Sequence, residues 1–539
     1  MLYTGAGSAA AVRLPAAPRL PHRHLLLAPL ATVAVLAAAV LPSIGSGVAR
    51  VGAPAARLGV LTAFSPGAHL AGLMSLPAAA QAPISAALGR DLAELTPSDG
   101  VGTLRHIGGG AGGGGEGGGG PGGAGDQFGW SVATSGHTVV VGAPYHRARS
   151  QADSGAVYVF QMPASGWASA TQTAELTDST LGAKKELGFS VAISSDGDTI
   201  VAGAPAGSEV PGDPNGVNTQ GTVDVFTTTG RWRSTSTPAA RLTVAGSPQT
   251  ENTLGGELGW SVAISGHTIV AGAPYDPTYL SPGAVYVFNR PPGGWSGPQT
   301  QAAELTERAP PTNGNGFGSS VDISGNTIVI GAPRYAPSVV ENTSHQHGAA
   351  FVFSGPWSGN RTQTATLTAN NASPTSDDEL GWSVAVSAKT IVAGAPFHTV
   401  GSNLGQGAAY VFVMPATGRW LTRTQTAELT APEGQTGDEF GWSVAVSGHT
   451  IVAGALNRQI DGRDSQGASY VYTQPSHGWK TTNADTAELT ASNGYNGDDL
   501  GASVAVSGAT IVAGAPEHNA GSQTSDFGAA YVFGPGPAS

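Results

Sequence analysis

One sequence unit occurs seven times in this chain, at intervals of about 60 residues. Each copy begins with Phe-Gly or Leu-Gly, reaches Gly-Ala-Pro or a near variant about fourteen residues later, and ends on an apolar run such as 155–160. The copies open at Phe128, Leu187, Leu258, Phe317, Leu380, Phe440 and Leu500. A fixed period of this length indicates a solenoid, a propeller or an array, because each unit buries its apolar face only against its neighbours.

Each unit contains four segments with strand character. In the first unit they are 130–135, 138–144, 155–160 and 171–177, and the fourth recurs at 424–430 and 484–490. β-branched and aromatic residues dominate these segments, and Gly, Ser, Asn, Asp and Pro separate them. Four antiparallel strands make one propeller blade. We therefore predict an all-β fold, a seven-bladed β-propeller of four-stranded antiparallel blades.

The seventh unit lacks its fourth strand, because its apolar run ends at Phe533. The missing motif stands near the other end of the chain, at 92–96, before the first Phe-Gly. We predict that this N-terminal strand completes the last blade and closes the ring. A linear solenoid would have no use for such a permutation.

The N-terminal 49 residues have the anatomy of an export signal. Arg13, Arg19 and Arg23 precede an apolar run at 25–41, and the small residues 47–49 suit a cleavage site. An uncleaved signal anchor is the alternative, since the run is just long enough to span a bilayer. Either alternative predicts an extracellular location: secreted, or at the cell surface if the segment is retained.

Domain boundaries follow from these segments. Residues 1–49 are the signal peptide or signal anchor, 50–90 an Ala/Pro-rich linker, and 91–539 the propeller. The glycine tract 108–125 is an insertion between the closing strand and the first blade. Such a tract cannot pack and is predicted to be a tether.

The composition excludes several classes of binding partner and site. The formal net charge is -12, so nucleic acid is not expected as a partner, because binding it requires a basic face. The chain has no cysteine, which excludes disulfides and thiolate metal sites. We expect membrane contact only through an uncleaved N-terminal segment.

The motif pair Phe-Gly and Gly-Ala-Pro at this spacing resembles the FG-GAP repeat. The resemblance covers residues 92–533; six of the seven units carry Gly-Ala-Pro, and the sixth has Gly454-Ala455-Leu456. It implies a propeller similar to the N-terminal domain of integrin α chains and to bacterial-type secreted FG-GAP proteins. It also implies a role in adhesion or protein binding through the loops of one face.

Calcium sites of the integrin type are not expected here. In that family an Asp-rich loop between strands one and two often holds calcium, which requires six to eight oxygen ligands. Here these turns are short, as in Ser135-Gly136-His137, and poor in carboxylates. Blade two alone has two acids, Asp196 and Asp198, which form the one weak candidate metal site. We expect no cofactor, and we interpret His137, His267 and His449 as turn residues.

Acidic residues gather just before the Phe/Leu-Gly motifs. They are Asp126, Glu186, Glu257, Asp378, Glu379, Asp438, Glu439, Asp498 and Asp499. A sevenfold ring would bring them to one rim. This rim is either an anionic surface for a cationic partner or a divalent ion, or a set of turn residues that serve solubility.

Three functions remain open from the sequence. The preferred hypothesis is a secreted or surface-tethered binding or adhesion module for an extracellular protein or other surface ligand. The alternatives are an extracellular lyase or glycosidase that works in the central funnel, and a structural envelope protein. Neither a Gly-x-Ser-x-Gly nor a His-Glu-x-x-His motif occurs, so we predict that the protein is not an enzyme. Its carboxylates leave a glycosidase pair open.

Overall fold

The computed structural model describes twelve segments of the chain. They are residues 93–96, 125–148, 153–164, 166–167, 170–205, 221–245, 256–274, 283–308, 314–336, 346–371, 377–518 and 527–534. The predicted export signal, the linker and the glycine tract up to 124 lie outside these residues.

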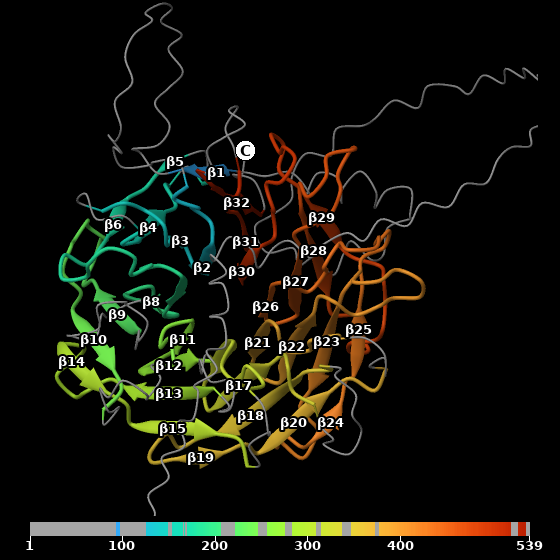
Figure 1. Ribbon diagram of the computed structural model, residues 1–539, viewed down its shortest axis with the longest axis horizontal. Coiled ribbons are helices and arrows are strands. Elements are labelled where there is room, and N and C mark those ends of the chain that lie inside the picture. Colours follow the sequence, from blue (N-terminus) through green and yellow to red (C-terminus); the bar gives the residue numbers. More distant parts are fainter. Residues whose placement is uncertain are drawn as a thin grey trace, which may run out of the picture. The chain divides into compact units, whose positions relative to one another are not determined.

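Seven blades form a ring, and each blade has four antiparallel strands in the order predicted (Figure 1). The first strands are β2 (Ser131–Ser135), β7 (Ser190–Ile193), β11 (Ser261–Ser265), β16 (Ser320–Ser324), β21 (Val384–Ser387), β26 (Val444–Ser447) and β30 (Ser503–Ser507). The second strands are β3 (Thr138–Ala143), β8 (Thr199–Ala204), β12 (Thr268–Ala273), β17 (Thr327–Ala332), β22 (Thr390–Ala395), β27 (Thr450–Ala455) and β31 (Thr510–Ala515).

The third and fourth strands complete each blade. The third strands are β4 (Ala156–Gln161), β9 (Thr222–Thr227), β13 (Ala284–Asn289), β18 (Ala349–Ser354), β23 (Ala408–Val413), β28 (Ala468–Thr473) and β32 (Ala529–Phe533). The fourth strands are β6 (Ala174–Leu176), β10 (Ala240–Thr243), β15 (Ala303–Thr306), β20 (Ala365–Thr368), β25 (Ala427–Leu429), β29 (Ala487–Leu489) and β1 (Ala93–Thr96). Because the strands alternate in direction, the strand two-to-three and four-to-one connections share one face, which we call the loop face.

The predicted ring closure is confirmed. The N-terminal strand β1 pairs antiparallel with β32, with Ala93 opposite Val532 and Leu95 opposite Ala530. Figure 1 shows the two strands next to each other. The joint between blades seven and one is further closed by a hydrogen bond from the Phe128 N–H to the Phe527 carbonyl (3.1 Å).

The predicted four-stranded blade is incomplete, because several blades carry a fifth segment on the outer edge. These segments are β5 (Ala170–Thr171), β14 (Gly297–Thr300), β19 (Arg361–Thr362) and β24 (Arg423–Thr424), and each pairs in parallel with the fourth strand of the preceding blade. The fourth strands predicted at 171–177 and 424–430 therefore divide in two. Their first residue pairs with the preceding blade, and the Ala-Glu-Leu part pairs within its own blade.

The hydrophobic core lies between blades rather than inside them. Each of the seven buried clusters combines side chains from two neighbouring blades, and one of them joins blade seven to blade one. In that cluster Phe128 is fully buried and meets Tyr158 and Phe160 edge-on. The Phe or Leu of the repeat motif thus serves as a packing residue, which explains why it recurs in every unit.

The two repeated glycines also meet across blade boundaries. The motif glycine after Phe or Leu has a positive φ of 90–97°, as at Gly441. A Cβ added to the glycine of Gly-Ala-Pro, as at Gly394, would overlap the Gly441 carbonyl oxygen of the next blade, and the same holds around the whole ring. In blade five Ser383 Oγ donates to that same carbonyl (2.9 Å). The repeat motif is therefore the contact surface between blades.

Candidate functional site

Five aromatic side chains lie near the start of the first strands, directly after the Phe/Leu-Gly motifs. These inner aromatic residues are Trp130, Phe189, Trp260, Trp382 and Trp442, all half-buried. They contact one another between blades: ring centroids are 5.4 Å apart for Trp130 and Phe189, 4.8 Å for Phe189 and Trp260, and 4.7 Å for Trp382 and Trp442. The first strands, among them β2, β11, β21, β26 and β30, lie toward the middle of the ring (Figure 1).

The acids predicted to form one rim occupy two different environments. Those directly before the Phe or Leu are Glu186, Glu257, Glu379, Glu439 and Asp499, which we call the inner carboxyls. All five have left-handed backbone, with φ of 53–58°. All five are half-buried and stand three residues before the position of the inner aromatic residues.

Burial raises the pKa of Glu186, Glu257, Glu379 and Glu439 from 4.5 to about 7. The charge of Glu257 in the next blade contributes to the rise at Glu186. In Glu257 and Glu379 the Oε2 atom is buried and accepts no hydrogen bond from any described residue. Carboxyl oxygens without a donor are expected to attract one, because leaving a buried acceptor unpaired costs about 1–3 kcal/mol.

The acids one position earlier are not on an exposed rim, which corrects the prediction. Asp126, Asp378, Asp438 and Asp498 are at most 5% exposed. Each pairs with a side chain that follows the Gly-Ala-Pro or Gly-Ala-Leu motif. The pairs are Asp126 with His146 (2.8 Å), Asp378 with His398 (3.2 Å), Asp438 with Arg458 (3.2 Å) and Asp498 with His518 (2.8 Å). These aspartates join two loops of one blade and are not available to a ligand.

These His and Arg partners were not predicted from the sequence, although their spacing from the aspartates is constant. The partner stands 20 residues after the aspartate in each of the four blades. In three of them a glutamate of the fourth strand lies on the other side of the His or Arg: Glu175 at 3.8 Å, Glu428 at 3.6 Å and Glu488 at 3.9 Å. A basic side chain between two acids lowers the free-energy cost of burying their carboxylates.

Blade two carries the opposite charge at two of these positions and an additional acid at a third. Lys185 replaces the aspartate, Asp224 stands where blade one has Tyr158, and Arg241 replaces the strand-four glutamate. Arg241 donates from Nε to Asp224 (3.0 Å) and also contacts Asp178. The charge is inverted at two positions, but the buried groups remain paired.

The weak metal candidate has a structural explanation. The Asp196 carboxylate accepts hydrogen bonds from the Ser194 hydroxyl and from the Asp198 N–H (3.2 Å), which lower its pKa. Both acids are exposed turn residues. Within the described segments no group of three His, Asp or Glu side chains has the arrangement of a metal site. The absence of bound calcium stays a prediction, and His137, His267 and His449 lie in exposed turns.

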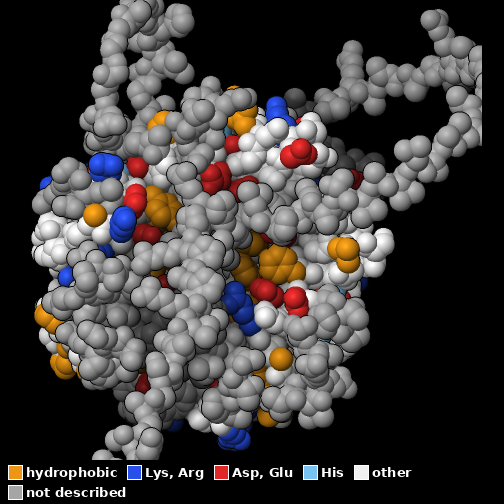
Figure 2. Space-filling model, viewed as in Figure 1, with side chains coloured by type: hydrophobic (Ala, Val, Ile, Leu, Met, Phe, Trp, Pro, Cys, Tyr) orange, Lys and Arg blue, Asp and Glu red, His pale blue; other side chains and the backbone are white. Residues whose placement is uncertain are grey.

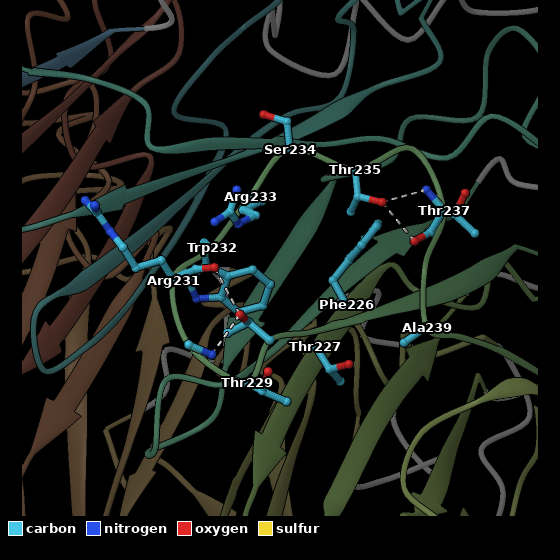
Figure 3. A pocket seen from close by; sticks show the side chains of 12 residues that line it. Phe226, Thr227, Thr229, Arg231, Trp232, Arg233, Ser234, Thr235, Thr237 and Ala239 are labelled. Atoms are coloured by element: carbon cyan, nitrogen blue, oxygen red, sulfur yellow. Dashed lines mark hydrogen bonds between the residues drawn. The ribbon is translucent and has the colours of Figure 1, made fainter.

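A separate hollow of about 510 Å³ lies in the strand three-to-four connection of blade two (Figure 3). Phe226, Trp232 and Arg233 line it together with several threonines. Trp232 is buried and donates from Nε1 to the Gly197 carbonyl (3.0 Å), while Arg231 extends away from the other lining side chains. This connection lies on the face opposite to the inner carboxyls, so the two features do not form one site.

We expect the propeller to lose stability as the pH rises from about 4.5 to about 7. Over this range the four inner glutamates stay largely protonated in the folded protein but ionise in the unfolded chain. The folded state then binds more protons, so raising the pH favours unfolding, by on the order of 1 kcal/mol per carboxyl. The measurement is the free energy of unfolding in urea at pH 5 and pH 8, for the parent and for a variant with all four changed to Gln.

The quadruple variant should show a flatter pH profile than the parent. Glu433→Gln, which changes an exposed glutamate on the same face, should leave the profile unchanged. Equal pH dependence in the parent and the quadruple variant would show that these carboxyls are not buried as described.

Comparison with known proteins finds one matching family. The family model described as FG-GAP repeat matches residues 121–160, 255–288, 301–353, 361–412, 423–472 and 484–533, just over half of the chain. The matches omit blade two, the blade with inverted charges. A search of curated proteins finds no match. No helix among the described residues is long and apolar enough to span a membrane.

Proposed function

The chain belongs to the FG-GAP repeat family, and from this we propose that its propeller is a binding module that takes up a cationic group on the loop face. The ligand is an extracellular protein or surface molecule that presents a lysine, an arginine or another ammonium group. The inner aromatic residues and the inner carboxyls together form its site.

The observation that carries the proposal is that Glu257 and Glu379, each with a carboxyl oxygen that lacks a donor among the described residues, share a turn with an aromatic residue. The Trp260 N–H donates to the Glu257 carbonyl (3.1 Å), and the Trp382 N–H donates to the Glu379 carbonyl (3.0 Å). A guanidinium or ammonium group can lie over the face of Trp382 or Trp442. The same group can donate to Glu379, whose Oε2 lacks a donor among the described residues. Figure 2 shows hydrophobic and acidic side chains side by side near the middle of the face in view.

The remaining parts of the proposal follow from the sequence. We propose an extracellular location, secreted or at the cell surface, on the basis of the N-terminal segment. We propose a non-enzymatic role without a cofactor, because the chain contains neither a Gly-x-Ser-x-Gly nor a His-Glu-x-x-His motif. A net charge of -12 favours a cationic partner and disfavours nucleic acid.

The test uses the full chain and an array of peptides that carry arginine, lysine or uncharged citrulline at one central position. We expect arginine or lysine peptides to bind, and their citrulline counterparts to bind at least about tenfold more weakly, because a charge-assisted hydrogen bond contributes about 1.5–3 kcal/mol. Fluorescence anisotropy measures the affinities. Binding should weaken as salt is raised.

Matched variants locate the site. Glu379→Gln with Glu439→Gln should reduce the affinity about tenfold or more, whereas Glu433→Gln should leave it unchanged. The affinity should rise between pH 6 and pH 8, as the inner glutamates lose their protons. Binding that ignores peptide charge, or that survives the double change, would contradict the proposed site.

A further inference from the structure

The outer edges of the blades are closed in a repeating manner, with one exception. Four fourth strands pair in parallel with a full segment of the next blade: β1 with β5, β10 with β14, β15 with β19, and β20 with β24. Two more make single parallel bridges, Leu176 to Thr235 and Leu429 to Thr482. The seventh, β29 of blade six, pairs with β28 alone among the described residues.

The exception follows from the permuted topology. In the other blades the capping segment is the stretch of chain just before the next blade's fourth strand. The blade after blade six is blade seven, whose fourth strand is β1. The stretch just before β1 is therefore the counterpart of the other caps. We propose that residues 88–91 add to the outer edge of β29 as a parallel segment and cap blade six.

The register follows from the capped blades. Leu305 pairs with Arg361 and Leu367 pairs with Arg423. The single-bridge caps Thr235 and Thr482 stand five positions before Ala240 and Ala487. In every full segment the residue opposite the Leu stands four positions before the first residue of its own fourth strand, as Arg361 does before Ala365. Counted from Ala93, the same offset gives Gly89. The proposed pairs are thus Leu489 with Gly89 and Thr490 with Arg90.

The backbone of β29 offers the groups that such a segment needs. In blade five the Glu428 carbonyl accepts from the Thr482 N–H (2.9 Å), and the Thr430 N–H donates to the Thr482 carbonyl (3.3 Å). The corresponding groups of blade six are the Glu488 carbonyl and the Thr490 N–H, and neither has such a bond to a described residue. An edge with unpaired N–H and C=O groups is a template for an added strand.

Side-chain exposure agrees with an open edge. The Glu488 side chain is 41% exposed, against 16% for Glu428 and 29% for Glu175 in the capped blades. Arg90 would bring a positive charge next to this carboxylate. The N-terminal segment would then join three blades, because β1 already pairs with β32 of blade seven and β5 of blade one.

The absence of cysteine makes a crosslinking test direct. Paired residues on adjacent strands are about 4.8 Å apart, within the reach of a disulfide. The full chain with Arg90→Cys and Thr490→Cys should form an intramolecular disulfide under mild oxidation. The positive control is Thr306→Cys with Thr362→Cys, a pair that the structure places in register. The negative control is Arg90→Cys with Thr306→Cys.

The outcomes distinguish whether the outer edge of β29 is covered by residues 88–91 of the same chain or by a second copy. A yield near that of the positive control supports the proposal. A yield no higher than that of the negative control overturns it, and so does a disulfide between two chains, which would assign the edge to a second copy. Hydrogen exchange gives a test without cysteine: the Thr490 amide, the counterpart of the Thr430 amide that donates to the Thr482 carbonyl (3.3 Å), should be protected in the parent and exchange at least tenfold faster in Gly89→Pro/Arg90→Pro. An unprotected amide in the parent also overturns the proposal.

Discussion

Replacing Gly394 by alanine is expected to lower the free energy of unfolding by about 3–5 kcal/mol. The added Cβ would overlap the carbonyl oxygen of Gly441 in the next blade and the hydroxyl oxygen of Ser383. The carbonyl is backbone and cannot rotate away, so the two blades would have to separate. Because the core lies between blades, separation also weakens the buried cluster that joins blades five and six. Urea unfolding followed by tryptophan fluorescence measures the loss.

A matched glycine distinguishes this steric effect from a general cost of alanine. Gly230 is exposed, does not have a left-handed backbone, and has open space where a Cβ would lie. Gly230→Ala should therefore change the stability by less than about 1 kcal/mol, in either direction. If Gly394→Ala were as stable as Gly230→Ala, the close approach of the two motif glycines would not be what joins the blades.

The blades were predictable because their constraints are local and repeated. The Val and Ile positions of a strand such as β11 alternate with small residues, and the Ser-Gly turn at its end marks the hairpin. Ring closure was also predictable, since the missing fourth strand and the spare motif at 92–96 complement each other. The fifth segments were not, because the step from Thr171 to Ala174 continues one motif in sequence but moves between two sheets in space.

The site was predictable as a region but not residue by residue. Asp378 and Glu379 are adjacent acids, yet the first is buried against His398 and the second is half-buried, with a carboxyl oxygen that has no donor in the described part of the chain. The left-handed φ of 53° at Glu379 separates the directions of the two side chains. No local pattern marks a left-handed glutamate. The partner His398 stands 20 residues away and is recognised only when the blades are aligned.

Deleting residues 91–96 is expected to have an even larger effect, because it removes the strand that closes the ring. All five residues of β32 are buried in the intact protein, and their side chains contribute to the clusters on both sides of blade seven. Without β1, the outer edge of β32 is open and the two neighbouring clusters are exposed. We expect a loss of stability greater than that of Gly394→Ala, together with concentration-dependent association through the open edge. Light scattering and thermal unfolding measure the two effects.

Two comparisons make this result specific to the closing strand. Deleting six residues of the predicted linker, 77–82, shortens the chain equally and should leave stability and monomeric state unchanged. A synthetic peptide of residues 86–97, added to the 91–96 deletion, should restore both by pairing with β32, as in strand complementation. A deletion variant as stable and monomeric as the parent would refute closure by β1. Rescue by the peptide would show that the last blade is complete apart from this strand. The strand would then restore the blade without a covalent link to it.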